Sequence, residues 1–210
     1  MTPDGLHELA RAVRAVAHGR CVLTGEGAAF CLGADLKWLG SLADPGAGVA
    51  ELVAQHHEVV LSMHRCPAPV VAAVNGAAAG GGWSLALAAD YVVAAPSATF
   101  TAAYFRLGLT PDGGNSAFLG PRAMELLLTN RTLSADEARA MGLVNEVTED
   151  PLGRANELRL EDVPGETLLE TRRLLRPDLE RRLKDEAAAV EAAARRSEFK
   201  QALEAFLKRG

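Results

Sequence analysis

The segment PVVAAVNGAAAGGGWSLALAAD (Pro69–Asp90) is the most informative part of this sequence. It predicts an apolar strand, a loop of small residues and a helix that begins at Gly80-Gly81-Gly82. Glycines at a helix start leave backbone N–H groups uncovered, and the helix dipole favours negative charge there. Close packing alone explains one glycine, whereas three in a row destabilise a helix. The segment therefore predicts a ligand site that favours negative charge.

The spacing of these glycines differs from that of a dinucleotide-binding turn. Such a turn has the pattern G-x-G-x-x-G directly after the strand, with an acidic residue about twenty positions later. Here Asn75-Gly76 is followed by three alanines before the glycines. A Rossmann domain is therefore not predicted.

The composition is that of an ordinary globular protein with one domain. Of the 210 residues, 49% are hydrophobic and 23% are charged, so the chain can bury a substantial core. The 22 Lys and Arg against 27 Asp and Glu side chains leave a formal net charge of −5. This balance argues against a nucleic-acid-binding surface, and any binding of an anionic ligand must come from local groups.

Cysteine content and hydropathy predict a soluble cytoplasmic protein. The three cysteines, Cys21, Cys31 and Cys66, are too few and too irregularly spaced for a disulfide framework or a zinc site. Residues 1–4 lead into an amphipathic helix pattern, so no signal peptide is expected. Glycines and an asparagine interrupt the alanine-rich run at 70–89, so no membrane span is expected.

The order of the predicted elements indicates an α/β fold. Apolar periodicity, caps and turn signals predict helices over 4–17, 49–65, 115–129, 134–142 and 166–208, strands over 20–24, 91–95, 98–100 and 143–147, a loop over 25–32 and turns over 151–164. Strands that alternate with helices, followed by helices alone, predict stacked βαβ-type units and a helical C-terminal segment.

Four motifs follow one another along the chain. They are CVLTGEGAAFCLGADLKWL from Cys21, PVVAAVNGAAAGGGWSLALAADYVVAAPSATF from Pro69, LGLTPDGG from Leu107 and RAMELLLTNRTLSADEARAMGLVNEV from Arg122. In this order they resemble the crotonase or enoyl-CoA hydratase/isomerase superfamily. The resemblance implies an α/β crotonase (ClpP/crotonase-like) spiral of ββα units.

The same resemblance implies how the chain is divided. Residues 1–150 are expected to form the crotonase core, and residues 151–210 a helical segment that packs across subunits of a homotrimer, often doubled to a hexamer. Family members usually have a leading strand with a CoA-contacting loop before the first helix. That strand is missing here, so the core is expected to be N-terminally shortened, and both the edge of the sheet and the usual contact with the nucleotide end of CoA stay open.

The resemblance also implies an oxyanion hole. In the family, the backbone N–H groups at the positions of Ala34 and Gly81 bind the thioester oxygen, and Gly33, Asp35 and Gly80 beside them are expected to contact the substrate. Such donors stabilise the transition state by about 3–4 kcal/mol each. Asp35 is also expected to cap a short helix.

Hydratases of the family use two glutamates, at positions that are Ser84 and Tyr104 in this sequence. Neither side chain has a carboxylate that activates water at neutral pH. The sequence therefore does not predict the usual hydratase mechanism.

Asp112, between a proline and two glycines, is the carboxylate in the most suggestive position. Several enoyl-CoA isomerases of the family place their single acid/base group here, and a 1,3-proton shift requires one carboxylate. The predicted enzyme shifts a 3-enoyl to a 2-enoyl thioester, in fatty acid metabolism, through a dienolate held by the oxyanion hole. Pro-Asp-Gly is also a strong turn sequence, so a structural role for Asp112 stays open.

Two alternative functions stay open. In a hydrolytic dehalogenase of the superfamily, an aspartate at the Asp112 position is the nucleophile, an aromatic residue occupies the Tyr104 position and a histidine at the His57 position activates water. A hydratase-like member could use the same Asp112 and His57. The shortened chain could instead be a non-catalytic acyl-thioester-binding or assembly protein.

Three histidines, His56, His57 and His64, lie on one predicted helix. No carboxylate or cysteine joins them at ligand spacing, so they are expected to be surface residues rather than metal ligands.

The predicted ligand is an acyl thioester of CoA or of a carrier protein. CoA would be a substrate handle, and no metal, nucleotide or flavin cofactor is required. Trp83, Tyr104, Leu109 and Pro111 are candidates for shaping the acyl pocket, with plain core packing as the alternative for Trp83 and Tyr104. Neither a nucleic acid nor a membrane is expected as a partner.

Overall fold

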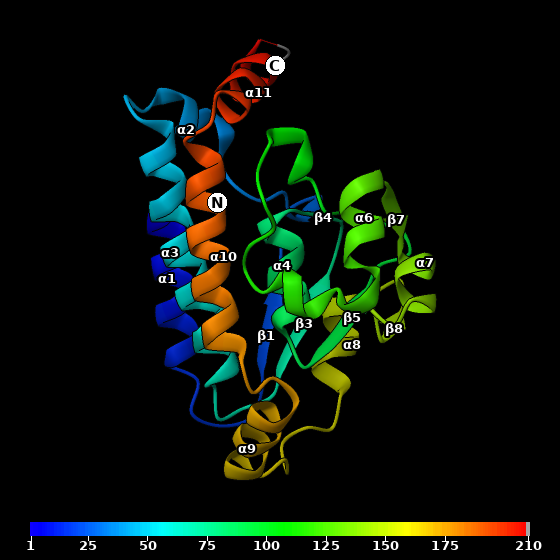
Figure 1. Cartoon of the computed structure of the whole chain (residues 1–210). Helices are drawn as coiled ribbons and strands as arrows, with labels where there is room; N and C mark the ends of the chain where they lie inside the picture. The colour runs from blue at the N-terminus through cyan, green and yellow to red at the C-terminus, as the bar shows by residue number, and fades with distance from the viewer. Residues whose placement is uncertain (209–210) are drawn as a thin grey trace.

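Two four-stranded sheets form the centre of the computed structural model, which describes residues 1–208 (Figure 1). The strands are β1 (Cys21–Thr24), β2 (Ala29–Cys31), β3 (Val70–Val74), β4 (Ala77–Ala79), β5 (Tyr91–Ala94), β6 (Thr99–Thr101), β7 (Thr132–Ser134) and β8 (Glu146–Val147). The first sheet has the order β1-β3-β5-β8 and the second the order β2-β4-β6-β7. Only the pair of β6 and β7 is antiparallel among the paired strands of residues 1–208.

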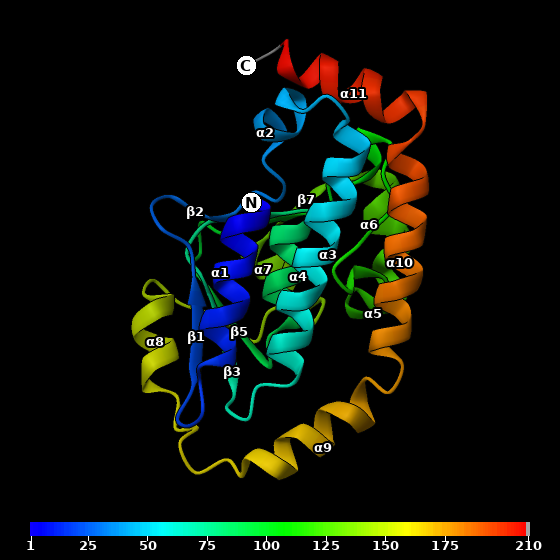
Figure 2. The same ribbon diagram turned by 90° about the vertical axis from the view of Figure 1, so that its left-hand side faces the viewer.

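Eleven α-helices and two short 3-10 turns surround these sheets within the described residues. The helices are α1 (Pro3–Arg14), α2 (Leu36–Ser41), α3 (Pro45–His64), α4 (Gly81–Ala88), α5 (Asn115–Phe118), α6 (Ala123–Thr129), α7 (Ala135–Ala140), α8 (Pro151–Glu157), α9 (Gly165–Leu175), α10 (Leu179–Ala194) and α11 (Ser197–Leu207), and the turns are η1 (Phe105–Leu107) and η2 (Gly120–Arg122). Figure 2 shows α1, α3 and α10 side by side, with α9 at one end of this layer and α2 and α11 at the other.

The chain repeats a strand–strand–helix unit. The strands β1 and β2 precede α2 and α3, and β3 and β4 precede α4. Equivalent strands of successive units pair in parallel, with Cys21 opposite Val70 and Val71 opposite Tyr91. The predicted spiral of ββα units with a helical C-terminal segment is confirmed.

The central strand β3 divides the core into two parts. Val70, Ala72 and Val74 belong to the main core, which also contains the buried faces of α1, α3, α4 and α10. Val71 and Ala73 point the other way, into a second cluster with residues of β5 and α8. Every residue of β3 is buried, as expected of a parallel strand that is covered on both faces.

Two predicted loops contain regular elements, so these predictions were wrong. The segment 25–32 includes β2, whose three residues are too few for a pattern and pair with β4 through an irregular register. The segment 151–164 includes α8, which begins with Pro151 after the N-cap Asp150; the Asp150 side chain accepts a hydrogen bond from Gly153 N–H (2.8 Å). An aspartate followed by proline is a helix start as well as a turn signal, because the first helical N–H needs no partner within the helix.

The predicted helix over 115–129 is also wrong in part, because it is interrupted. It consists of α5, the 3-10 turn η2 and α6. Gly120 has a φ of 58° and is followed by Pro121. A left-handed glycine and a proline without an N–H group together break the helical hydrogen-bond pattern.

Two predicted helix caps are confirmed. The Asp35 carboxylate accepts the N–H groups of Lys37 (3.0 Å) and Trp38 (2.9 Å) at the start of α2. Ser134 and Glu137 form a reciprocal capping box at the start of α7. Caps of this kind depend on residues that are close in sequence, which is why the sequence reveals them. No helix between residues 1 and 208 has the length and the apolar character that a bilayer span needs.

Candidate active site

A cavity of about 710 Å³ lies where the end of β2, the start of α4 and the helices α3, α10 and α11 meet. Eight of the predicted site residues line it: Gly33, Ala34, Asp35, Gly80, Gly81, Tyr104, Leu109 and Asp112. Residues of α3 and α10, including Leu52, Val53 and Val190, supply an apolar wall. A mostly apolar cavity with a few convergent polar groups is typical of a small-molecule site.

Two backbone N–H groups are available at one side of this cavity. Within residues 1–208, neither Ala34 N–H nor Gly81 N–H donates a hydrogen bond to a side chain or to the backbone of another element. The start of α4 packs closely against the end of β2. Only glycine at position 82 permits this approach, because any side chain there would collide with the carbonyl of Cys31. Free N–H groups at a helix start suit an oxygen that carries negative charge.

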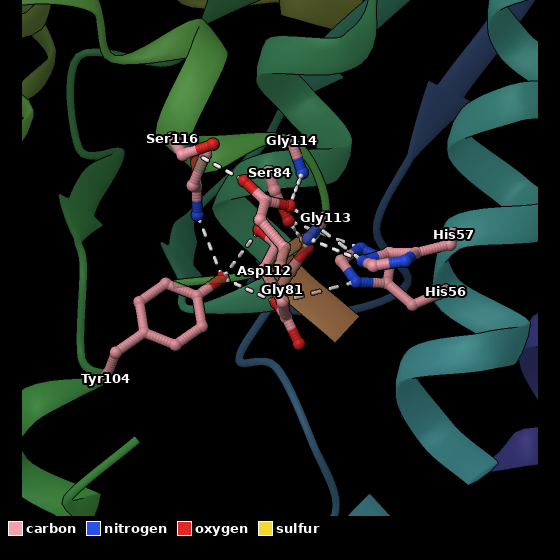
Figure 3. A network of polar contacts seen from close by, with 11 residues as sticks. His56, His57, Gly81, Ser84, Tyr104, Asp112, Gly113, Gly114 and Ser116 are labelled. Carbon is pink, nitrogen blue, oxygen red and sulfur yellow. Dashed lines mark hydrogen bonds and ion pairs between the residues drawn. The ribbon is translucent and has the colours of Figure 1, made fainter. Parts of the chain in front are cut away.

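Asp112 faces the same cavity from the loop before α5, and only 9% of the residue is exposed. The Tyr104 hydroxyl donates to Asp112 Oδ1 (2.8 Å) and accepts from Asn115 Nδ2 (2.9 Å). Figure 3 shows Asp112 between Tyr104 on one side and His56 and His57 of α3 on the other. Burial raises the pKa of the Asp112 carboxyl, and the Tyr104 hydrogen bond offsets part of that rise.

Neighbouring helices fix the loop that carries Asp112. The N–H of Gly113 donates to His57 Nε2 (3.1 Å). The N–H groups of Gly114 and Ser116 donate to the two carboxylate oxygens of Glu186 on α10 (2.7 and 2.9 Å). A side chain at Gly113, whose φ is 66°, would collide with the His56 ring and the Ser84 hydroxyl. Tertiary contacts therefore determine the position of Asp112.

His56 lies between Asp112 and α4 and is 2% exposed. Its Nδ1 is 3.7 Å from Asp112 Oδ1, and its Nε2 is 3.2 Å from Ser84 Oγ. Burial lowers the pKa of His56 to about 4, so the imidazole is neutral at pH 7.

Several sequence predictions about the site need correction. His56 and His57 are buried rather than on the surface, because α3 packs against α1, α4 and α10. Trp83 is fully buried against Phe100, with ring centroids 5.8 Å apart, and belongs to the core rather than to the acyl pocket. Neither Pro111 nor His57 lines the cavity within the described chain.

Three residues of the site were missed by sequence reasoning: His56, Ser84 and Glu186. A signal for Glu186 was present, because it occupies the apolar stripe of α10 between Leu183 and Val190. A carboxylate in such a stripe indicates a buried partner. No sequence signal distinguished His56 from its neighbour His57.

The family model described as "Enoyl-CoA hydratase/isomerase" matches residues 5–209. The chain belongs to this family. A solved structure of an enoyl-CoA hydratase/isomerase from Mycobacterium paratuberculosis has a TM-score of 0.85 and 30% identity, and the match covers 98% of this chain and 88% of that chain. The fold is therefore the crotonase fold.

Curated relatives of the family carry names for different reactions. A protein from Rhodobacter capsulatus named "Probable enoyl-CoA hydratase" is 45% identical over an alignment of 152 residues, and the match covers 69% of this chain and 58% of that protein. The 4-chlorobenzoyl coenzyme A dehalogenase-1 of an Arthrobacter species is 41% identical over 61% of this chain and 49% of its own length. The 1,2-epoxyphenylacetyl-CoA isomerase of Escherichia coli is 40% identical over 62% of this chain and 53% of its own length. The matched part of the chain spans about half the length of these relatives.

Glu186→Gln is expected to destabilise the protein, because one of the two N–H groups that Glu186 accepts would then face the amide NH₂. A buried donor without an acceptor costs about 1–3 kcal/mol, which urea unfolding would measure. The matched control Asp185→Asn makes the same chemical change at an exposed position of α10 and is expected to stay within about 0.5 kcal/mol of the wild type. Equal stabilities of the two variants would contradict the role of Glu186.

Acidification is expected to destabilise the protein through its buried histidines. The pKa values of His56 and His57 are both lowered to about 4, first by burial. Because an unfolded chain binds their protons near pH 6.5, their contribution is complete above that pH and is lost as the pH falls towards 4. The raised pKa values of Asp112 and Glu186 act in the opposite direction, since burial favours their protonated forms.

The contribution of one histidine can be isolated by comparing unfolding free energies at pH 7 and pH 5. The wild type is expected to lose about 2 kcal/mol more than His56→Gln over this interval. An equal loss in both proteins would show that His56 does not titrate as its burial requires.

Proposed function

We propose that this protein is an acyl-thioester double-bond isomerase, which converts a 3-enoyl thioester into a 2-enoyl thioester. The observation that carries the proposal is the set of carboxylates on the cavity. Among the described lining residues these are Asp35 and Asp112, and Asp35 is engaged as the cap of α2. Asp112 is therefore the carboxylate available for proton transfer.

The proposed reaction uses the two N–H groups and this carboxylate. The N–H groups of Ala34 and Gly81 bind the thioester oxygen while ionised Asp112 removes a proton from C2. The electron pair of the C–H bond passes into a dienolate, whose negative oxygen the N–H groups stabilise. Asp112 then returns the proton to C4, which leaves the double bond conjugated with the thioester.

The residues at the hydratase positions support isomerisation over hydration. Ser84 donates to the carbonyl oxygen of Gly81 (2.8 Å), and Tyr104 donates to Asp112. Neither group can remove a proton from water at neutral pH, because their ordinary pKa values lie far above 7; burial raises the pKa of Tyr104 further. An isomerase needs no attacking water.

The proposed ligand is an acyl-CoA or a carrier-tethered acyl thioester. Each of the three relatives described above has a name that refers to a CoA compound, and the apolar wall of the cavity suits an acyl chain. A cytoplasmic location stays a prediction from the cysteine content. A trimer or hexamer, built with the segment 151–210, stays a prediction from the family resemblance.

The hydrolytic dehalogenase is the second candidate, supported by the 41% identical Arthrobacter relative. Asp112 and Tyr104 both line the cavity. His57, however, accepts Gly113 N–H at Nε2 (3.1 Å) and does not line the cavity within the described residues. The lone pair that would activate water is already occupied, so isomerisation is the better proposal.

The test is to incubate the protein with 3-enoyl-CoA substrates in deuterated water. Ultraviolet absorbance follows conjugation, and mass spectrometry follows deuterium at C2 and C4. Conjugation is the expected result. A protein that binds CoA by calorimetry but shows neither conjugation nor exchange would refute the isomerase. Chloride release from 4-chlorobenzoyl-CoA would then favour the dehalogenase, and binding without either reaction would favour a non-catalytic member.

A further inference from the structure

The contacts of Ser84 determine which nitrogen of His56 carries the proton. Ser84 Oγ lies 2.8 Å from the carbonyl oxygen of Gly81 and 3.2 Å from His56 Nε2. A hydroxyl has one hydrogen, and a carbonyl oxygen only accepts. The hydrogen of Ser84 therefore goes to Gly81 at the shorter distance, and His56 Nε2–H donates to Ser84.

The other nitrogen of His56 is then bare and faces the proposed catalytic carboxylate. His56 Nδ1 is 3.7 Å from Asp112 Oδ1, and the hydrogen of the Tyr104 hydroxyl already points at this oxygen. Two lone pairs with no proton between them repel each other. Protonation of Asp112 removes that repulsion, so the neutral imidazole favours the acid form of Asp112 over the carboxylate.

The other ionisable groups near His56 include His57 and the amino group of Met1. A charged His57 would lower the pKa of Asp112, but burial lowers the pKa of His57 itself to about 4, so it is neutral at pH 7. His57 lies on the same helix with its ring centroid 6.3 Å away, and its Nε2 is 3.9 Å from Glu186 of α10. Burial is the main cause of the lowered pKa of His56, and a hydrogen bond to the Gly81 backbone offsets part of it. The amino group of Met1, which donates to Gly33 O (2.6 Å), lowers the pKa of His56 further by repulsion. Burial and the amino group of Met1 together keep His56 neutral.

We infer that His56, held in its Nε2–H tautomer by Ser84, is a positioning residue that makes Asp112 a stronger base. The inference rests on the proposed isomerase and deepens it. His56 itself neither gains nor loses a proton in the reaction, since the proton moves from C2 to Asp112 and then to C4. A more basic carboxylate removes the C2 proton faster, because general-base efficiency rises with basicity.

The first test is the pH dependence of kcat/KM, whose acidic limb reports the ionisation of Asp112. In Ser84→Ala, His56 can place its hydrogen on Nδ1 and donate to Asp112, which stabilises the carboxylate. The limb is expected to move to lower pH by about one unit, with a several-fold fall in kcat. His56→Asn puts an amide N–H near the same place and is expected to move the limb in the same direction.

Two controls separate this effect from ordinary loss of structure. His56→Gln keeps a donor to Ser84 without an atom at Nδ1, and is expected to shift the limb less than His56→Asn. Ser62→Ala removes a similar buried hydroxyl on α3, which donates to Glu58 O (2.7 Å) away from the cavity, and is expected to leave the limb unchanged. If the acidic limb of kcat/KM stays at the same pH in both Ser84→Ala and His56→Asn, the inference is overturned, even if activity falls.

A second test needs no turnover, and it distinguishes failure of this inference from failure of the isomerase itself. Nitrogen-15 NMR of histidine-labelled protein is expected to show Nδ1 of His56 unprotonated and Nε2 protonated. Carbon-13 NMR of the Asp112 carboxyl, assigned with Asp112→Asn, is expected to titrate at lower pH in Ser84→Ala than in the wild type. A protonated Nδ1 in the wild type, or equal carboxyl titrations, would refute the inference.

Discussion

Asp112→Asn is expected to lower the isomerase turnover by about 10²–10⁴-fold, the usual contribution of a positioned general base. Asparagine has nearly the same shape and keeps an oxygen that accepts the Tyr104 hydroxyl, but it cannot take a proton from C2. The rate of conjugation of a 3-enoyl-CoA and the deuterium content at C2 measure the loss. Both are expected to fall together, because one group performs both proton transfers.

The same variant is expected to keep its fold and its ligand affinity. Burial raises the pKa of the Asp112 carboxyl and so already favours its neutral form. A neutral amide in the same place therefore adds no buried charge. Asp44→Asn is a suitable control: Asp44 caps α3 by accepting Ala47 N–H (3.1 Å), and asparagine caps a helix equally well. Turnover of Asp112→Asn within a few-fold of this control would show that Asp112 does not transfer the proton.

Arg172→Met is expected to cost about 3–5 kcal/mol of unfolding free energy, because it takes a donor from the buried carbonyls of Cys66 and Ala68 and the ion-pair partner from Asp90. Arg172 is 4% exposed and belongs to α9. Its Nε donates to Asp90 Oδ1 (2.8 Å), and its terminal nitrogens donate to Asp90 Oδ2 and to the carbonyls of His64 (3.3 Å), Cys66 and Ala68 (3.1 Å). Removal of the guanidinium leaves these acceptors with one donor fewer each.

Thermal unfolding measures this loss directly. For a domain of this size the melting temperature is expected to fall on the order of 10 °C. Arg173→Met changes an exposed arginine on the same helix and is expected to shift the melting temperature by little. If both variants have the same melting temperature, Arg172 does not anchor α9 to the segment that leads into β3.

The sequence by itself determined the features that depend on close neighbours along the chain. The apolar run of β3, the glycines at the start of α4 and the caps at Asp35 and Ser134 all follow from local sterics, hydrogen bonding and periodicity. The order of these features led to the crotonase fold and to Ala34, Gly81 and Asp112 as candidate residues. Their roles in a reaction stay predictions.

Only the tertiary structure decided which side chains surround Asp112. Glu186 is 72 positions from Gly114 and His57 is 56 positions from Gly113, so no local pattern could place them there. Burial likewise depends on what packs against an element. Because α3 is covered on several sides, His56 and His57 are neutral neighbours of the carboxylate rather than the expected surface residues. The position of Asp112 follows from these long-range contacts. Its raised pKa follows from burial, because desolvation acts through space rather than along the chain.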